Sequence, residues 1–239
     1  MTGLATLDVR QLLSDCKQSI VDLGPSQALD RFLQRHAPGE LVRAVLVDDQ
    51  LLRRAADESY RHANGFDKLI LASTPLGHTL KMDVWWPEDP RGQEDVHNHR
   101  YDFSSHVIAG ALFMEHYEAC ETGVVMDHLR VEMAGRTDHL HRLDQQTVER
   151  RFAVQLPAGG TYSLHHAQLH RVTVDAGALT ATLAFQGRTA QQVSDVYRLP
   201  GSDRGNGHYY PPFSVTGFKE RLERLTAAMD LAGLEQARA

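Results

Sequence analysis

Two histidines separated by a single residue, His97 and His99, are the first residues of this sequence whose type and spacing suggest chemistry. On a β-strand, residues i and i+2 point to the same face, so two imidazoles at this spacing can bind one metal ion. Histidine occurs 14 times among the 239 residues, and that composition alone gives roughly 0.8 such pairs by chance. The spacing alone is therefore weak evidence for a metal site, and the residues around the pair have to decide.

A second pair with the same spacing, His139 and His141, has a different context. It lies among Asp138, Arg142 and Asp144 with few apolar neighbours, which favours a polar surface turn over a pair of ligands. The first pair follows an apolar strand pattern and a loop that contains Pro and Gly, and it precedes another apolar run. This context favours the first pair as the ligands, since a barrel strand that turns polar residues inward needs a functional reason.

A third ligand has to come from a later strand. His170 begins a predicted strand just after the turn at residues 157–160. His165 and His166 are alternatives for the third ligand. Either could instead orient the ligands through hydrogen bonds without binding the metal. Asp102 is an alternative carboxylate ligand. The pattern alone leaves these alternatives open.

The elements that must position these residues change in character along the chain. Helical periodicity predicts helices over residues 4–23, 26–36 and 40–59, with Ser26 as an N-cap, and a closing helix over residues 214–231. Between them, residues 67–198 show alternation and short apolar runs, separated by turn residues, which predict a β-sandwich or β-barrel. We expect one mainly β domain over residues 1–239, with an N-terminal helix cluster within residues 1–60. The predicted strands are 69–73, 79–86, 104–109, 112–118, 123–132, 151–156, 160–164, 171–174 and 179–186.

Composition excludes several classes of protein. The net charge is −6 and no long basic run occurs, which argues against nucleic acid as a partner. Two cysteines, Cys16 and Cys120, are too few for a disulfide framework. Without a leader-like N-terminus or a long apolar stretch, the chain is expected to be soluble, cytoplasmic and without a membrane partner. Its oligomeric state is not determined by these features.

Residues 59–186 resemble the cupin superfamily and, within it, the thiol dioxygenases: cysteine dioxygenase and its bacterial mercaptopropionate-oxidising relatives. The similar segments occur in the family's order. They are Tyr60-Arg61-His62, similar to a Tyr-x-Arg segment without its spacer; the strand ending Val84-Trp85-Trp86 before His97-x-His99; and Tyr162, followed eight residues later by His170-Arg171-Val172.

The resemblance implies a cupin-type β-barrel, or double-stranded β-helix, with a three-histidine non-haem Fe(II) site. It implies His97, His99 and His170 as metal ligands, and Arg61 and Tyr162 as substrate-binding residues. The implied activity is that of an oxygenase, using O₂ to oxidise a small carboxylate-bearing thiol or amino-acid-like metabolite. The alternative is a cupin with a non-oxidative metal-dependent role (isomerase, lyase or binding protein), because three histidines do not specify the metal.

The sequence also departs from this family's pattern. One difference from ordinary cupins is shared with the thiol dioxygenases: Ser104 stands where ordinary cupins have a glutamate, and the thiol dioxygenases lack that glutamate too. The cross-linking cysteine of the animal enzymes is absent, and the strand over residues 180–185 lacks the family's Ser, His and Tyr near the iron. Tyr209 and Tyr210 lie in a proline-rich stretch that we expect to form a structural turn. The alternative is a loop that returns one of these tyrosines to the site. The resemblance therefore does not extend to cysteine as the substrate.

Overall fold

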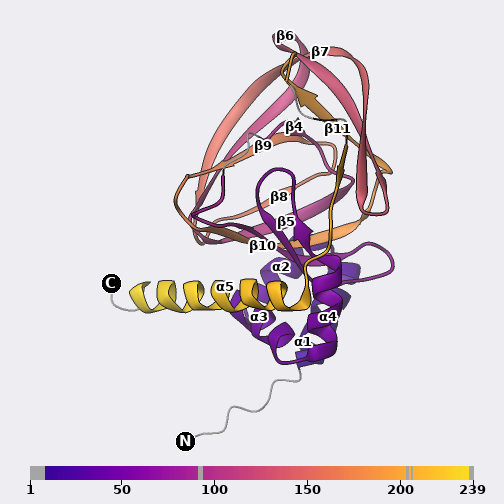
Figure 1. Ribbon diagram of the computed structural model, residues 1–239. Helices are drawn as coiled ribbons and strands as arrows, with labels where there is room; N and C mark the ends of the chain where they lie inside the picture. Colours follow the sequence, from indigo (N-terminus) through magenta and orange to yellow (C-terminus); the bar gives the residue numbers. More distant parts are fainter. Residues whose placement is uncertain (1–8, 91–93, 203–204, 206, 237–239) are drawn as a thin grey trace, which may run out of the picture.

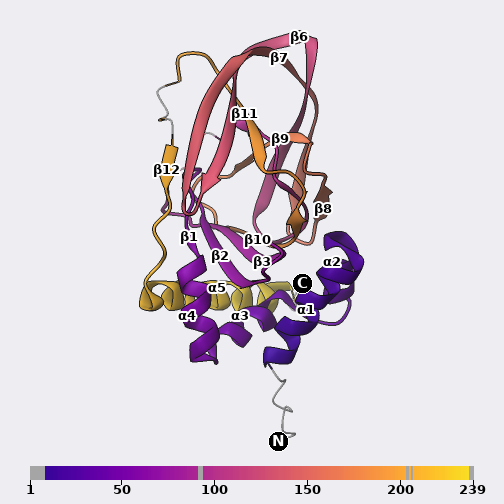
Figure 2. The ribbon, with the colours of Figure 1, turned by 90° about the vertical axis from the view of Figure 1, so that its right-hand side faces the viewer.

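The computed structural model describes residues 9–90, 94–202, 205 and 207–236. Twelve strands form two antiparallel sheets in this part of the chain, and five helices gather at one end of them (Figures 1 and 2). Four of these helices precede the strands and one follows them. The predicted fold class, mainly β with an N-terminal helix cluster and a C-terminal helix, is confirmed.

Each sheet contains six strands. The first has the order β1-β2-β3-β10-β5-β8, and the second has the order β11-β4-β9-β6-β7-β12, in which β11 also pairs with β6. Crossovers between strands that are distant in sequence bring β3, β5 and β10 side by side. The bounds are β1 Tyr60–Arg61, β2 Asp67–Ser73, β3 Thr79–Trp85, β4 Val96–His97, β5 Tyr101–Ala109, β6 Ala111–Ala134, β7 Thr137–Pro157, β8 Thr161–Leu164, β9 Leu169–Val174, β10 Thr180–Thr189, β11 Val193–Arg198 and β12 Gly207–Tyr209.

The helices differ from the prediction at two points. The segment predicted as one helix over residues 40–59 forms two, because the Asp48 carboxylate accepts from the backbone N–H groups of Gln50 and Leu51 and starts a new helix. The predicted N-cap Ser26 is wrong: Gly24 is the N-cap, and a proline, which has no N–H to satisfy, follows it. The bounds are α1 Val9–Leu23, α2 Pro25–Leu33, α3 Pro38–Leu46, α4 Asp49–Glu58 and α5 Val215–Gln236.

Residues 4–8 of the first predicted helix lie outside the described residues. Within the described part, none of the helices has the length and apolar character needed to span a bilayer.

The strand predictions fail mainly around the long hairpin of β6 and β7. The predicted strands 112–118 and 123–132 are one strand, β6, whose pairing is irregular between Ala119 and Val124. The surface turn predicted around His139 and His141 is wrong, because both residues lie within β7, although their side chains are exposed. The predicted loop over residues 199–212 contains the short strand β12, which pairs with β7.

The main hydrophobic core lies between the helices and the outer face of the first sheet. Leu80, Met82 and Val84 of β3 are fully buried there, and Leu183 and Phe185 of β10 join them. From the helices, the same core receives residues that include Leu29, Leu41, Val42, Leu52, Phe218 and Leu222. Because side chains alternate along a strand, the residues between these apolar ones face the interior between the two sheets. The interior is therefore free to be polar.

Candidate metal centre

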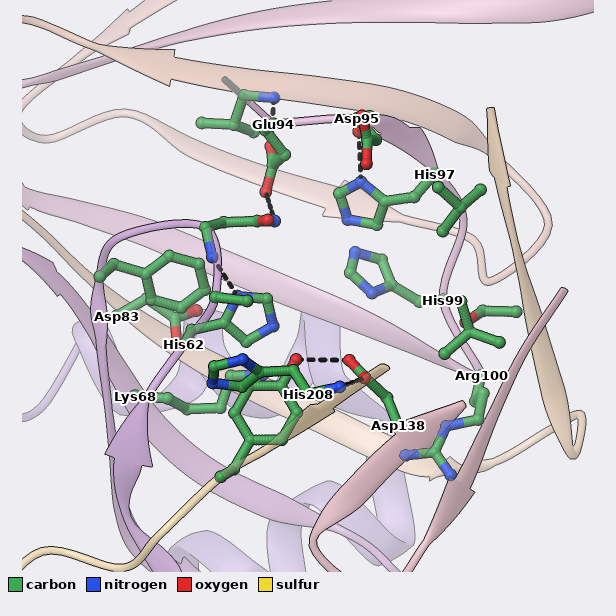
Figure 3. Close-up of a pocket in the computed structure, with 18 of the residues that line it drawn as sticks. His62, Lys68, Asp83, Glu94, Asp95, His97, His99, Arg100, Asp138 and His208 are labelled. Carbon is green, nitrogen blue, oxygen red and sulfur yellow. Dashed lines mark hydrogen bonds between the residues drawn. The ribbon is translucent and has the colours of Figure 1, made fainter. Parts of the chain in front are cut away.

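The three predicted metal ligands meet at the junction between the two sheets. His97 ends β4, and it pairs in register with His170 of β9. His99 lies two residues further on, in the connection that leads to β5 in the other sheet. Figure 3 shows the His97 and His99 rings projecting into the same pocket. The i, i+2 spacing thus brings the two imidazoles together where the chain passes from one sheet to the other. We had expected both histidines to lie on one continuous strand.

The geometry of the three rings suits a single ion. Their centroids are 4.9 Å apart for His97 and His99, 4.6 Å for His97 and His170, and 4.9 Å for His99 and His170. The Nε2 atoms of His99 and His170 are 3.3 Å apart. Two imidazole nitrogens that bind one ion at about 2.0–2.1 Å lie roughly 3.0–3.4 Å from each other. The observed separation therefore matches two ligands of a shared metal.

Hydrogen bonds to the backbone fix the orientation of two of these rings. Nδ1 of His97 lies 3.0 Å from the carbonyl oxygen of Asp95, and Nδ1 of His170 lies 3.4 Å from that of Gln168. A carbonyl oxygen only accepts, so Nδ1 must carry the proton in both rings. The Nε2 lone pairs are then left for a metal, which is the usual arrangement of metal-binding histidines.

The protonation state of the site also favours a metal. Burial is the main reason that the pKa values of His99 and His170 lie well below the ordinary value, and the neighbouring histidines lower them further. The neutral imidazole is the form that binds a metal. Together with the fixed orientations, this makes the three histidines a fit for a divalent transition metal, while their role as iron ligands stays a prediction.

The alternative ligands form a separate group. Asp102 Oδ1 accepts from the backbone N–H of His166 at 2.7 Å and from its Nδ1 at 2.8 Å, and His165 Nε2 is 4.0 Å away. The ligand atoms of these three residues also lie within 4.8 Å of one another, but they are not part of the three-histidine group. The His166 carbonyl accepts from the backbone N–H of His99. Asp102 therefore supports the loop that holds a candidate ligand.

The histidines open onto a cavity of about 620 Å³ between the two sheets. The opposite wall comes from the inner face of the first sheet, where Lys68, Lys81 and Asp83 line the cavity. Sequence reasoning missed these three residues. The signal that could have found two of them is the alternation in β3, where Lys81 and Asp83 stand between apolar residues that pack on the helices.

Tyr162, a predicted substrate-binding residue, lines the same cavity from β8. Its ring packs edge-on against Phe103, with centroids 5.9 Å apart. Burial raises the pKa of its phenol above the ordinary value, so the group is protonated at neutral pH and can donate a hydrogen bond. The structure thus brings Tyr162 into the same cavity as the histidines, and its contact with substrate stays a prediction.

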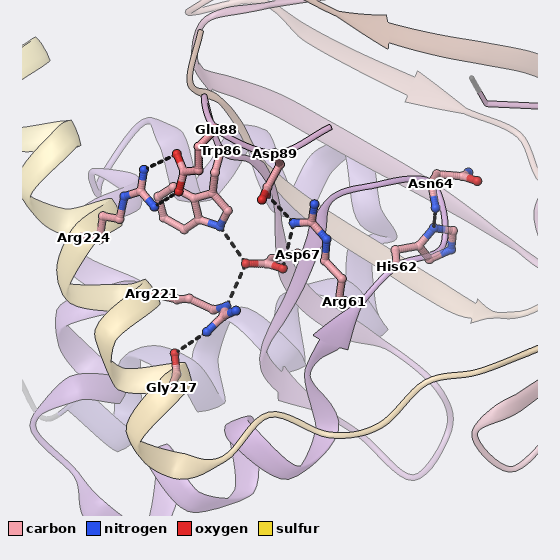
Figure 4. A network of polar contacts seen from close by, with 10 residues as sticks. All are labelled: Arg61, His62, Asn64, Asp67, Trp86, Glu88, Asp89, Gly217, Arg221 and Arg224. Atoms are coloured by element: carbon pink, nitrogen blue, oxygen red, sulfur yellow. Dashed lines mark hydrogen bonds and ion pairs between the residues drawn. The ribbon is translucent and has the colours of Figure 1, made fainter. Parts of the chain in front are cut away.

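Arg61, the other predicted substrate-binding residue, is not brought to this cavity. Its Nη1 atom lies 3.1 Å from Asp67 Oδ1 and 2.5 Å from Asp89 Oδ2 (Figure 4). Asp67 also accepts from Trp86 Nε1 and Arg221 Nε, which ties β2 and the residue that follows β3 to α5. Side chains alternate between the two faces of a strand, and Tyr60 and His62 on either side of Arg61 line the cavity. The Arg61 side chain therefore points away from the cavity. The geometry gives Arg61 a structural role.

The two tyrosines of the proline-rich stretch, Tyr209 and Tyr210, lie in different environments. Tyr209 is exposed, but it ends the short strand β12 and does not lie in the structural turn that we expected. Tyr210 is buried and lines the cavity, where its hydroxyl donates to Asp138 Oδ2 at 2.6 Å and its ring lies 4.8 Å from that of Tyr60. One tyrosine of this stretch therefore returns to the cavity wall.

Two antiparallel sheets that enclose a polar cavity, with three histidines facing it, define a cupin-type barrel, also called a double-stranded β-helix. No protein-family model and no curated protein matches this sequence.

Solved structures that resemble this chain include a cupin-like protein from Thermotoga maritima, with a TM-score of 0.33 and 8% identity over 67% of this chain and 90% of that one. Another is a hydroquinone 1,2-dioxygenase in complex with Cd²⁺ and 4-hydroxybenzonitrile, with a TM-score of 0.35 and 14% identity over 59% and 78%. A third is Drosophila melanogaster CENP-C bound to CAL1, with a TM-score of 0.34 and 10% identity over 68% and 98%. Such likenesses carry no information on activity, and a barrel of this type hosts many functions.

Proposed function

We propose that this protein is a non-haem Fe(II)-dependent oxygenase that uses O₂ to oxidise a small carboxylate-bearing thiol or amino-acid-like metabolite. The observation that carries the proposal is the convergence of three imidazoles, those of His97, His99 and His170, on the wall of a cavity. A bound Fe(II) would supply open coordination positions for the substrate and O₂, since only three come from the protein.

The protein's own residues would orient and enclose the reactants. The backbone carbonyls of Asp95 and Gln168 hold two of the rings with Nε2 toward the ion. Tyr162 offers a protonated phenol within the cavity. A cavity of about 620 Å³ accommodates a small metabolite. Holding both reactants side by side in one place is a large part of what such a site can contribute to rate.

The charge of the site favours an anionic substrate. Three neutral imidazoles leave a bound divalent ion with its full positive charge, because none of the three ligands is a carboxylate. A thiolate or carboxylate that reaches this ion would offset part of that charge. This supports substrates that bind as anions.

The test begins with anaerobic reconstitution of the purified protein with Fe(II), followed by metal analysis. We expect one iron per chain and O₂ uptake that depends on a member of a panel of small thiol carboxylates and amino acids. His170→Ala should lose the iron. His106→Ala is the matched control, since this histidine contacts Thr161 and lies outside the three-histidine group.

Two results would contradict the proposal. Zinc in the purified protein, together with no O₂ uptake with any compound, would support a non-oxidative metal-dependent role. Stoichiometric iron retained by His170→Ala would show that this histidine is not a ligand.

A further inference from the structure

Two lysines and an aspartate form a charged wall of the cavity, which we call the lysine wall: Lys68, Lys81 and Asp83. The Lys81 and Asp83 side chains are only 7% and 14% exposed. Figure 3 shows Lys68 and Asp83 on one side of the pocket and His97 and His99 on the other. Charges are rarely placed in a protein interior without a partner or a function, because removing them from water is costly.

The strand register places the two lysines within reach of one ligand. Lys68 of β2 pairs with Asp83 of β3, and Ile70 pairs with Lys81. Lys68 and Lys81 are therefore diagonal neighbours on the same face of an antiparallel pair. Such neighbours are about 7–8 Å apart, a gap that long side chains bridge. Both ammonium groups can converge on a single small anion.

The lysine wall carries a net positive charge. Lys81 Nζ is 3.1 Å from Asp83 Oδ2, so these two charges compensate each other. In the part of the chain that the structure describes, Lys68 has no carboxylate at ion-pairing distance; its hydrogen-bonding neighbour is the Tyr60 hydroxyl, and its Nζ lies 5.4 Å from the centre of that ring. One positive charge is thus left for a ligand.

The neighbouring groups keep this charge in place. Burial alone would lower the pKa of Lys68, but Tyr60, Tyr101 and Asp83 more than offset it and raise that pKa above the ordinary value. His62, which also lines the cavity, is held neutral, because burial and then the charge of Lys68 lower its pKa well below the usual range. The cavity therefore holds a protonated Lys68 beside a neutral imidazole.

We propose that Lys68 and Lys81 bind the carboxylate of the substrate, and so direct the rest of the molecule toward His97, His99 and His170. This assignment rests on the function proposed above for the same cavity, and it replaces Arg61 in the role of carboxylate binder. A carboxylate suits the site better than a phosphate, because a single net positive charge beside Asp83 matches a monoanion. The Tyr60 hydroxyl, next to Lys68, is a further donor for the same group.

The experiment compares 3-mercaptopropionate with its methyl ester, which keeps the thiol but lacks the negative charge. Both are titrated calorimetrically into the apoprotein and into the Zn(II)-loaded protein, neither of which turns over substrate. We expect the wild-type protein to prefer the acid. Lys68→Met should weaken binding of the acid by about tenfold to a hundredfold and leave the ester unchanged, as expected for the loss of a charged hydrogen bond.

Two controls separate binding from folding. Lys81→Met alone would leave Asp83 unpaired, so the second variant is the double substitution K81M/D83N, which removes the pair together; it should also lose the preference for the acid. Lys219→Met changes an exposed lysine of α5 and should bind both compounds as the wild type does. Circular dichroism and Zn(II) content establish that each variant is folded and loaded.

The outcomes distinguish this inference from the function on which it rests. If the wild-type protein does not prefer the acid, or if Lys68→Met and K81M/D83N bind it normally, the lysine wall is not the carboxylate site, whatever the protein does with O₂. If the preference depends on these lysines but the iron-loaded protein consumes no O₂, the anion site stands and the oxygenase proposal fails.

Discussion

Asn98 and Asp195 exchange three hydrogen bonds at the point where the chain passes between the two candidate ligands His97 and His99. The Asn98 backbone N–H donates to the Asp195 carbonyl at 3.1 Å, and the Asp195 N–H donates to Asn98 Oδ1 at 2.7 Å. Asn98 Nδ2 also donates to Asp195 Oδ2 at 3.1 Å. The residue between the two candidate ligands is thereby fixed to β11, and the two histidines beside it line the cavity.

Replacing Asn98 with Ala should therefore weaken metal binding without unfolding the protein. The two side-chain hydrogen bonds would be lost, and His97 and His99 would sample other orientations. Loss of such supporting contacts costs about tenfold to a hundredfold in metal affinity. Competition with a chelator measures the affinity, and Gln18→Ala on the exposed face of α1 is the control. Unchanged affinity in Asn98→Ala would mean that the backbone alone holds the two ligands.

Arg61→Met tests the role that the structure gives to this residue. Its partners Asp67 and Asp89 lie outside the cavity wall, so we expect a lower free energy of unfolding and an unchanged affinity for 3-mercaptopropionate. The loss of stability should be smaller than for Asp67→Ala, which leaves both Arg61 and Arg221 without this carboxylate. Urea unfolding and calorimetric titration of the same preparations provide both quantities. A selective loss of acid binding in Arg61→Met would restore this arginine as the carboxylate binder.

The stability of the apoprotein should fall as the pH drops below about 6.5. Burial is the largest cause that lowers the pKa values of His62, His99 and His170 well below the ordinary value for histidine, about 6.5. Below that value, the unfolded chain binds protons that the folded chain does not, and each such group costs up to about 1.4 kcal/mol per pH unit. The loss continues until the pH reaches the lowered pKa values of the folded state.

Urea unfolding of the apoprotein across this pH range measures the slope. His62→Gln should reduce it by the share of one group, while His141→Gln, which replaces an exposed histidine, should not. An identical slope for wild type and His62→Gln would contradict the assignment of His62 as a buried neutral group.

The sequence was informative about the fold wherever periodicity was strong. Alternation of apolar residues predicted most strands, and the stripes on the helices predicted the N-terminal helix cluster and the C-terminal helix. Boundaries failed where a local contact decided them, as at Asp48, whose side chain starts α4 within a segment that looks like one helix. The hairpin of β6 and β7 failed for another reason: the polar residues around His139 look like a turn, yet the pairing of two long strands keeps them extended.

The sequence predicted the histidines of the candidate site but not the charged residues on the opposite wall of the cavity. His97, His99 and His170 come together as the spacing and the resemblance implied. The prediction that Arg61 lies at the cavity failed. The direction of its side chain depends on the alternation within a two-residue strand, and no sequence motif reveals that strand. Lys68 and Lys81 carried no motif either. Their position becomes meaningful only when the register of β2 and β3 places them on one face, opposite the histidines.

Asp102→Ala should weaken metal binding from outside the ligand set. Its carboxylate holds the His166 backbone and ring, and the His166 carbonyl accepts from the His99 backbone N–H at 3.0 Å. The loop before β9 would then be less fixed. The candidate ligand His99 is hydrogen-bonded to this loop, and the candidate ligand His170 follows it in β9. We expect a loss of about tenfold in metal affinity, at the lower end of the range for supporting groups. The measurement is chelator competition at neutral pH.

Asp102→Asn distinguishes this supporting role from direct ligation. The amide oxygen can still accept from the His166 N–H, so this variant should retain most of the affinity that Asp102→Ala loses. A direct carboxylate ligand would be lost equally in both variants, because both remove the negative charge. Equal losses in the two variants would therefore place Asp102 on the metal and contradict the separation of the two groups seen in the structure. Rescue by Asn would show that position, rather than charge, is what Asp102 contributes.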